Sequence, residues 1–389
     1  MVRTALDNHE RIIRPLIGNK KAGILCHASS INSEFRHIVD IIFHSEYSEL
    51  TAIFGPQHGL FGQTQDNMIE WEGYMHPHYG VPVFSLYGKT RKPNRDMLAN
   101  IDTLMVDLQD VGSRPYTYVW TLKHCMEACA ENNIPVIVID RPNPLGGIKR
   151  DGALLKREFY TFVGGAEIPL CHGLTIGEIA LFMNDKENIN CNLNILKMEG
   201  WQRTMKWSET GLPWVFPSPN MPSINTAMVY PGMVLVEALN ISEGRGTTLP
   251  FELCGAPFLD IGKVIYELNS MKIPGCAFRK HNFIPTFHKF AGEYCNGMQI
   301  HITNFELFEP VYTAASVFKK MHEISDKLEF IDPPYEYEEH LIPFDILSGD
   351  SLLRKVISGQ GSLNHERERW KDEINIFNKE FKEFMLYKV

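Results

Sequence analysis

The sequence predicts an α/β protein whose N-terminal half forms a Rossmann-like, doubly wound parallel sheet. Three observations support this fold class. Short apolar runs recur along the first half, they are continuous instead of alternating with polar residues, and polar loops and helical stretches separate them. Continuous apolar runs are typical of strands covered on both faces. Strands that alternate with helices favour a parallel sheet.

The elements of this sheet can be placed one by one. Helical stretches at residues 34–44 and 118–132 lie between apolar runs. The runs themselves predict five strands, at residues 21–27, 50–54, 81–86, 103–108 and 134–139.

A second, smaller α/β or α+β domain is predicted for the C-terminal part. Residues 216–223 carry three prolines in a short span, which precludes regular structure there. We therefore expect an N-terminal domain at 1–230 and a C-terminal domain at 231–389. The second domain should contain an alternating strand at 297–303, a helix at 311–327 and an amphipathic terminal helix at 364–385.

The composition narrows the class of function. With 389 residues, 44% of them hydrophobic, the chain can bury a large core and exceeds one ordinary domain. A formal net charge of -9, spread along the chain, disfavours nucleic acid or an anionic membrane as partner. A small-molecule substrate, polar or neutral, fits better. The oligomeric state is left open.

Cysteine spacing and hydropathy bear on metals and location. The eight cysteines are scattered without C-x-x-C pairs, so we expect reduced thiols, no disulfide framework and no metal site. The first residues show no apolar signal segment. No run reaches the roughly 20 apolar residues of a membrane span. These observations predict a soluble, cytoplasmic protein.

Polar side chains follow the predicted strands, and in a parallel sheet the carboxyl ends of strands meet at the edge where ligands bind. The loop FGPQHG at residues 54–59 follows the second strand and supplies Gln57 and His58. We expect a polar pocket around this loop. Further candidates at the same edge are His27, Ser29, Tyr87, Asp107, Gln109, Asp110, Arg114, Asp140, Arg141 and Asn143.

Two common catalytic motifs are missing. The first strand is followed by neither G-x-G-x-x-G nor G-x-x-x-x-G-K-[ST], so nucleotide binding is disfavoured and no cofactor is expected. The chain also has no G-x-S-x-G elbow of a serine hydrolase.

Two later segments carry polar motifs. Thr175 and Glu178 have the spacing of a helix capping box, which favours a structural role for this glutamate, while His172 just before them fits a functional or a turn-stabilising role equally. In SEGRGTT, residues 242–248, glycines flank Arg245, whose guanidinium can bind a carboxylate through two parallel hydrogen bonds. The alternative for this segment is a simple turn with a solvated arginine.

Eight motifs, in order, resemble the NamZ-type exo-β-N-acetylmuramidases: FGPQHG, DLQDVGSRPYTY, DRPNPLGG, HGLTIGE, PSPNMPS, SEGRGTTLPFELCGAP, GMQIHIT and PFDILSGD. The resemblance implies a cleft between two domains and release of terminal N-acetylmuramic acid from peptidoglycan fragments. Its lactyl carboxylate would suit Arg245 or Arg141. The motifs also add Tyr116, Asn220 and Thr247 to the candidate substrate-binding residues.

One position departs from the family pattern. The first motif of these muramidases usually reads P-E-H-G, and its glutamate is the favoured catalytic acid. The corresponding residue here is Gln57, which cannot ionise. Family members are also usually exported.

Three outcomes remain open for the chemistry. Another carboxylate, such as Asp110, Glu72 or Glu243, supplies the proton, the 2-acetamido group of the sugar acts as nucleophile and Gln57 orients it. Alternatively, the protein cleaves a different sugar or another bond. Finally, it binds a saccharide without cleaving it. The predicted catalytic set is Gln57, His58, Asp110 and Glu243.

Overall fold

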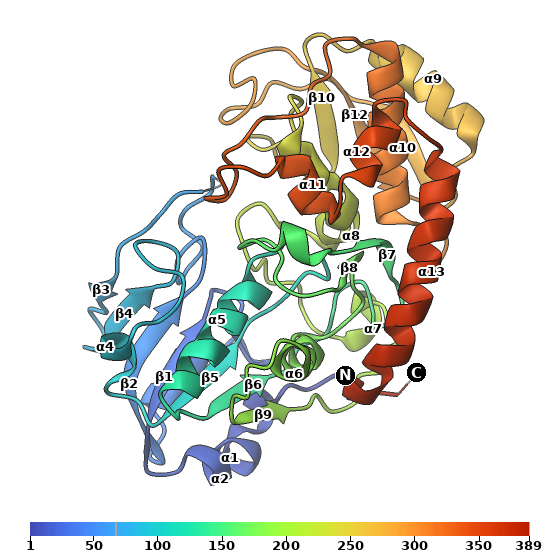
Figure 1. The fold of residues 1–389 in the computed structure, drawn as a ribbon. Coiled ribbons are helices and arrows are strands. Elements are labelled where there is room, and N and C mark those ends of the chain that lie inside the picture. Colours follow the sequence, from blue (N-terminus) through green and yellow to red (C-terminus); the bar gives the residue numbers. More distant parts are fainter. Residues whose placement is uncertain (67, 389) are drawn as a thin grey trace.

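A seven-stranded sheet forms the centre of the N-terminal half in the computed structural model, which describes residues 1–66 and 68–388 (Figure 1). All neighbouring strands are parallel except the pair β3 and β4. The predicted parallel α/β sheet is thus confirmed; β3 and β9 are edge strands that were not predicted. In spatial order the strands are β3 (Tyr74–Met75), β4 (Pro82–Ser85), β2 (Ser48–Gly55), β1 (Lys20–Cys26), β5 (Thr103–Asp107), β6 (Val136–Ile139) and β9 (Leu193–Leu196).

Helices cover both faces of this sheet, as the apolar strands require. Within β5, Leu104 and Val106 belong to a core shared with α5 and α6, whereas Met105 belongs to a core shared with the N-terminal helices and α3. The helices of this half are η1 (Ala5–Asn8), α1 (His9–Ile12), α2 (Arg14–Ile17), α3 (Ile38–Phe43), α4 (Arg95–Leu98), α5 (Tyr118–Glu131) and α6 (Ile176–Lys186).

The first predicted helix is shorter than expected. The Asn32 Oδ1 atom accepts hydrogen bonds from the backbone N–H groups of Glu34 and Arg36, at 3.0 and 2.8 Å. Phe35 has a φ of 61°, in the left-handed region. The Asn32 side chain therefore holds this segment in a turn, and α3 begins only after it.

The C-terminal part is α+β. Its three-stranded antiparallel sheet has the order β10 (Leu253–Ala256), β12 (Asn296–Ile302), β11 (Cys276–Lys280). The predicted strand at 297–303 and helix at 311–327 are confirmed as β12 and α10. The helices of this part are α9 (Ile261–Met271), α10 (Pro310–Ile324), α11 (Pro343–Ser348) and α12 (Leu352–Ile357).

Two helices link the two parts. The proposed division between residues 230 and 231 falls inside α8 (Ile224–Met233), so this boundary stays a prediction. The terminal helix is confirmed as α13 (Leu363–Phe381), which runs back to the N-terminal half (Figure 1). There Val2 and Tyr387 share a small apolar cluster.

The remaining elements are short. β7 (Asp151–Leu154) pairs with β8 (Pro169–Cys171) in a separate two-stranded sheet. The others are η2 (Arg157–Phe159), α7 (Trp207–Thr210), η3 (Val234–Ala238) and η4 (Lys382–Phe384). Among the described residues, none of the helices is long and apolar enough to cross a membrane.

Candidate active site

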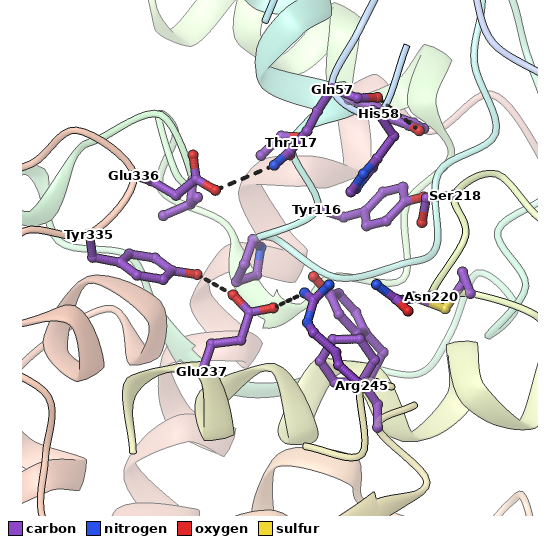
Figure 2. A pocket seen from close by; sticks show the side chains of 16 residues that line it. Gln57, His58, Tyr116, Thr117, Ser218, Asn220, Glu237, Arg245, Tyr335 and Glu336 are labelled. Carbon is purple, nitrogen blue, oxygen red and sulfur yellow. Dashed lines mark hydrogen bonds and ion pairs between the residues drawn. The ribbon is translucent and has the colours of Figure 1, made fainter. Parts of the chain in front are cut away.

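A pocket lies where the loop after β2 faces segments from the C-terminal part (Figure 2). It encloses about 460 Å³, counting the open space at its mouth. The β2 loop, the start of α5, η3 and the loop between α10 and α11 all contribute to its wall. The lining residues are Gln57, His58, Pro115, Tyr116, Thr117, Tyr118, Val163, Ser218, Asn220, Met221, Tyr230, Glu237, Arg245, Phe251, Tyr335 and Glu336.

Gln57 is tied to both sides of this pocket. Its Oε1 atom accepts a hydrogen bond of 2.7 Å from the Thr117 hydroxyl. Its Nε2 atom donates to Glu336 Oε1 at 3.4 Å. Because an amide has one acceptor end and one donor end, these contacts fix which end faces the carboxyl group.

Glu336 is a buried carboxyl group at the pocket wall. It is only 4% exposed, and the Tyr87 hydroxyl donates to its Oε2 at 2.8 Å. Burial raises the pKa of Glu336 to about 7, and the negative charge of Glu237 raises it further. The hydrogen bonds from Tyr87 and Gln57 act in the opposite direction and lower it. A carboxyl group with this pKa carries its proton about half of the time at pH 7.

Glu237, on η3, faces the same pocket as an ion-paired carboxylate. Arg245 Nη2 donates to its Oε1 at 2.6 Å, and the Tyr335 hydroxyl donates to its Oε2 at 2.5 Å. Arg245 also lies 3.0 Å from Glu243. Although burial opposes it, these two carboxylates raise the pKa of Arg245. The pocket thus holds one carboxyl group that is partly protonated and one that is paired with a fixed cation.

His58 presents a neutral imidazole. Burial lowers its pKa to about 4. Its Nδ1 atom lies 2.8 Å from the carbonyl oxygen of Thr64, which can only accept, so Nδ1 carries the proton and Nε2 is an acceptor. His58 and Gly59 both have left-handed backbones, with φ of 71° and 84°, and a Cβ on Gly59 would lie 2.5 Å from the Gln63 side chain. The turn that aims His58 therefore requires this glycine.

Five of the sequence-predicted residues line the pocket: Gln57, His58, Tyr116, Asn220 and Arg245. Tyr116 packs edge-on against Tyr118 and Tyr230. Asn220 donates from Nδ2 to the Gln65 carbonyl at 2.7 Å.

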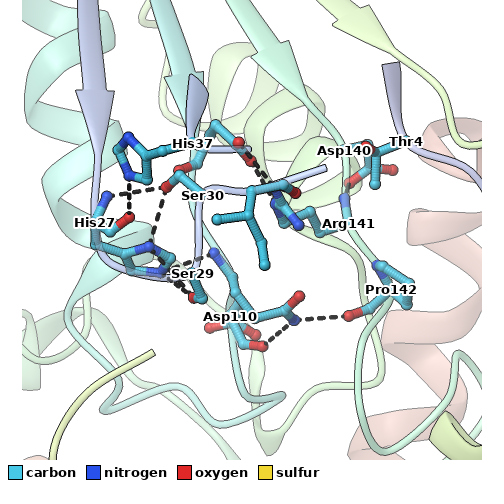
Figure 3. A network of polar contacts seen from close by, with 12 residues as sticks. Thr4, His27, Ser29, Ser30, His37, Asp110, Asp140, Arg141 and Pro142 are labelled. Carbon is cyan, nitrogen blue, oxygen red and sulfur yellow. Dashed lines mark hydrogen bonds and ion pairs between the residues drawn. The ribbon is translucent and has the colours of Figure 1, made fainter. Parts of the chain in front are cut away.

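Other predicted residues lie at the carboxyl edge of the sheet, but their polar atoms bond to the protein (Figure 3). Arg141 donates from Nε and Nη2 to the Asp107 carboxylate, the second bond being 2.8 Å long. Gln109 donates from Nε2 to the carbonyls of Asp110 and Pro142. Gln109 and Arg141 line a separate pocket with Trp207 and the N-terminal segment.

Asp110 and His172 are buried beside each other. Asp110 Oδ2 accepts from the Gly112 N–H at 2.6 Å and lies 3.2 Å from His172 Nε2. The His172 Nδ1 atom accepts from the Leu174 N–H, so in the neutral ring Nε2 carries the proton and faces Asp110. Neither side chain lines the main pocket.

Two more predicted residues make contacts inside the N-terminal half. Asp140 accepts from Thr175 Oγ1, the Gly177 N–H and the Tyr387 hydroxyl at 2.8, 2.8 and 2.6 Å. Asn143 donates from Nδ2 to the Leu174 carbonyl at 2.9 Å.

Arg114 and Thr247 likewise bond to backbone groups. Arg114 is fully buried and donates to the carbonyls of Ala153, Ile168 and Leu347. The Thr247 hydroxyl donates to the Gly244 carbonyl at 2.6 Å. None of these residues lines the main pocket, so their predicted role in substrate binding stays a prediction.

The carboxylates suggested as a relocated acid lie elsewhere. Glu243 is fully buried, and although burial opposes it, Lys289, His288 and Arg245 hold the pKa of Glu243 well below its usual range. Such a group holds no proton to donate near neutral pH. Glu72 is exposed and lines a different groove. The residues that sequence reasoning missed are therefore Glu237 and Glu336.

The signals for these two glutamates were weak. Glu237 is the lone acid in an otherwise apolar run, a pattern that could have marked it as a buried functional group. Glu336 stands close to Glu338 and Glu339, and no local feature separates the three. By contrast, the capping box of Thr175 and Glu178 is confirmed.

The comparisons with known proteins decide the family. The family model of the N-terminal part of exo-β-N-acetylmuramidase NamZ matches residues 22–225, and that of its C-terminal part matches residues 228–387. The chain belongs to the NamZ exo-β-N-acetylmuramidase family. The resemblance drawn from the eight motifs is confirmed.

Relatives of known sequence and structure agree with this assignment. A Bacillus subtilis (strain 168) protein described as peptidoglycan β-N-acetylmuramidase NamZ is 41% identical over 387 residues, covering 99% of this chain and 91% of its own. A DUF1343 family protein from Bacteroides fragilis NCTC 9343 has a similar structure, with a TM-score of 0.88, 32% identity, and coverage of 100% of this chain and 99% of its own. A second protein of that family from the same strain has a TM-score of 0.77 and 27% identity, with the same coverage.

Among the described residues, no three His, Cys, Asp or Glu side chains gather in a way that could hold a metal ion.

Proposed function

We propose that this protein is a glycosidase that releases N-acetylmuramic acid from the non-reducing end of peptidoglycan fragments in the pocket around Gln57. Family membership and a 41% identical muramidase support the substrate class. The observation that carries the proposal is the pair Glu336 and Glu237, two carboxyl groups with different environments on one pocket. Such pairs are the usual chemistry of glycoside hydrolysis.

Glu336 is the general acid in this proposal. A leaving sugar hydroxyl needs a proton as the glycosidic bond breaks. With a pKa of about 7, Glu336 holds a proton near neutral pH and releases it readily, which is the balance that general acid catalysis favours. The Tyr87 hydroxyl then stabilises the carboxylate that forms, because it donates to Oε2.

Glu237 is the second carboxylate. Arg245 and Tyr335 fix its position. Two roles suit such a group: it accepts a proton from an attacking water, or it accepts a hydrogen bond from the acetamido N–H while the acetamido oxygen attacks the anomeric carbon. The first gives inversion at the anomeric carbon and the second gives retention, so the configuration of the first-formed sugar distinguishes them.

Glutamine at position 57 is compatible with Glu336 as the general acid. A glutamate at this position, as the family pattern expects, would lie within 3.4 Å of Glu336. Two carboxyl groups at this distance share one proton, because both cannot ionise freely. The neutral amide of Gln57 removes that competition and leaves the proton with Glu336.

His58 and Asn220 supply polar contacts to the bound sugar. The unprotonated Nε2 of His58 accepts a hydrogen bond from a sugar hydroxyl or from the acetamido N–H. The predicted partner is thus a small saccharide. Its aglycone and the cytoplasmic location stay predictions.

A panel of synthetic glycosides tests the proposal. We expect wild type to hydrolyse p-nitrophenyl β-N-acetylmuramide and to leave the β-N-acetylglucosaminide, which lacks the lactyl group, largely intact. Turnover of a different glycoside only would mean that the substrate is another sugar. Saccharide binding in calorimetry without turnover of any glycoside would mean a binding protein. Turnover that appears only in Gln57→Glu would show that position 57 must carry the acid.

A further inference from the structure

The loop that carries Glu336 is pressed against the N-terminal half through Arg91. The guanidinium carbon of Arg91 lies 3.7 Å from the ring centroid of Tyr337, 4.8 Å from that of Tyr87 and 5.4 Å from that of Phe162. Cation–π attraction at such distances strengthens as the cation loses water. The Arg91 side chain is only 19% exposed. Arg91 thus links Tyr337, which directly follows Glu336, to Tyr87, whose hydroxyl donates to the Glu336 carboxyl group.

Hydrogen bonds and an ion pair add to this packing between the two halves. The Tyr337 hydroxyl donates to Glu70 Oε1 at 3.0 Å, and Arg91 Nη2 lies 3.6 Å from the same oxygen. Arg91 Nη1 donates to the Gly88 carbonyl at 3.1 Å. Arg91, Tyr337 and Glu70 therefore form a clamp between the loops beside β4 and the loop before α11.

The backbone of the clamped loop adopts a costly conformation. Glu336 and Tyr337 have φ of 45° and 69°, in the left-handed region that side chains disfavour. Tyr335 and Glu338 exchange two backbone hydrogen bonds of 2.9 Å across this turn. Such conformations persist only where the surroundings impose them. Tyr335 is held by Glu237, Glu336 by Tyr87, and Tyr337 by Arg91, so loss of one contact loosens the others.

We propose that Arg91 is a positioning residue, which holds the Glu336 carboxyl group in the pocket by clamping Tyr337. This role builds on the proposed function, in which Glu336 donates the proton. Arg91 itself acts through Tyr337 and does not line the pocket. Tyr337 is 51% exposed, so its removal leaves the buried core unchanged.

The test compares Tyr337→Leu with Tyr266→Leu, a control on α9 where the tyrosine is 73% exposed. A displaced acid slows the chemical step more than binding. We expect kcat of Tyr337→Leu on the disaccharide, whose sugar leaving group needs a proton, to fall on the order of 10²-fold, the loss that a displacement of about 1 Å causes, with KM nearly unchanged. Tyr337→Phe keeps the ring over Arg91 but loses the bond to Glu70, so its kcat should lie between those of wild type and Tyr337→Leu.

The pH profile separates positioning from a merely structural effect. Arg91 lowers the pKa of Glu336, so Arg91→Met should move the alkaline limb of kcat/KM to higher pH, whereas Arg91→Lys should keep the limb but lower kcat. Methionine removes the positive charge, whereas lysine keeps the charge but lacks the planar guanidinium that stacks on Tyr337. The titratable and charged groups that interact with the Glu336 carboxyl group are Tyr87, Arg91, Tyr230, Glu237 and Tyr335.

Hydrogen exchange tests the clamp without turnover. Backbone amides of residues 335–341 should exchange at least about tenfold faster in Tyr337→Leu than in wild type, since the loop opens more often. Unchanged exchange would overturn the clamp. Faster exchange with wild-type kcat would overturn the positioning role. If wild type hydrolyses no glycoside, the proposed function fails and the catalytic part of this proposal fails with it, whatever the exchange shows.

Discussion

Replacing Glu336 with glutamine is expected to abolish acid catalysis while the pocket keeps its shape. Glutamine has nearly the same size, and its carbonyl oxygen can still accept the hydrogen bond from Tyr87. General acid catalysis contributes on the order of 10² to 10⁴ in rate. Loss of kcat on the natural disaccharide should therefore fall in this range.

Two leaving groups make this assay specific. A sugar hydroxyl leaves only with a proton, whereas p-nitrophenolate leaves without one. Glu336→Gln should thus lose about 10³-fold on the disaccharide but less than about 10-fold on the p-nitrophenyl glycoside. The matched control is Glu339→Gln, an exposed glutamate of the same loop, which should match wild type on both substrates.

The dependence of kcat/KM on pH gives a second quantitative test. Because the acid form is active and its pKa is about 7, about a tenth of Glu336 carries a proton at pH 8. Wild-type kcat/KM on the disaccharide should fall about tenfold for each pH unit above this pKa, and the limb should vanish in Glu336→Gln. Equal losses on both leaving groups, or an alkaline limb that survives the substitution, would refute Glu336 as the acid.

Three further predictions follow, two from the contacts of Glu336 and one from the buried ion pair of Arg203 and Glu178. The pKa of Glu336 rises from 4.5 to about 7 on folding, so its contribution to stability is fully present below pH 4.5 and is lost as pH rises through 7. In urea titrations across this window, the free energy of unfolding of wild type should therefore fall by about 3 kcal/mol relative to that of Glu336→Gln, and a constant difference would contradict the shifted pKa. Tyr87→Phe removes a bond that lowers this pKa, so the alkaline limb should move up by about one pH unit; a downward shift would exclude this contact as a stabiliser of the carboxylate. Arg203→Met leaves the buried Glu178 carboxylate without its cation and should cost about 3–5 kcal/mol in urea unfolding, against less than about 1 kcal/mol for the exposed Arg11→Met; equal effects would show that the buried pair adds nothing special.

The sheet was predictable because its strands carry their signal locally. β1, β2, β5 and β6 are continuous apolar runs, and each was placed within two residues. The start of α3 was missed because one Asn32 side chain bonds to two backbone N–H groups and holds a turn where the pattern suggested a helix. Side-chain competition of this kind leaves little trace in hydrophobic periodicity.

The candidate site was predictable only in part. Gln57 and His58 could be singled out because they follow a buried strand. Glu336 contacts Gln57 across 279 residues of sequence, and no spacing rule reaches that far. Conversely, Asp107 and Arg141 were predicted to bind substrate, but their side chains form a buried ion pair with each other. Residue type alone does not reveal such pairing.

A chain with glutamine at position 57 is expected still to release N-acetylmuramic acid. The most direct measurement is mass spectrometry of wild-type protein incubated with the disaccharide N-acetylmuramyl-β-1,4-N-acetylglucosamine. We expect free N-acetylmuramic acid and free N-acetylglucosamine in equal amounts, at a rate that Glu336→Gln reduces on the order of 10³-fold. An intact disaccharide with wild type, together with cleavage by Gln57→Glu, would contradict this expectation.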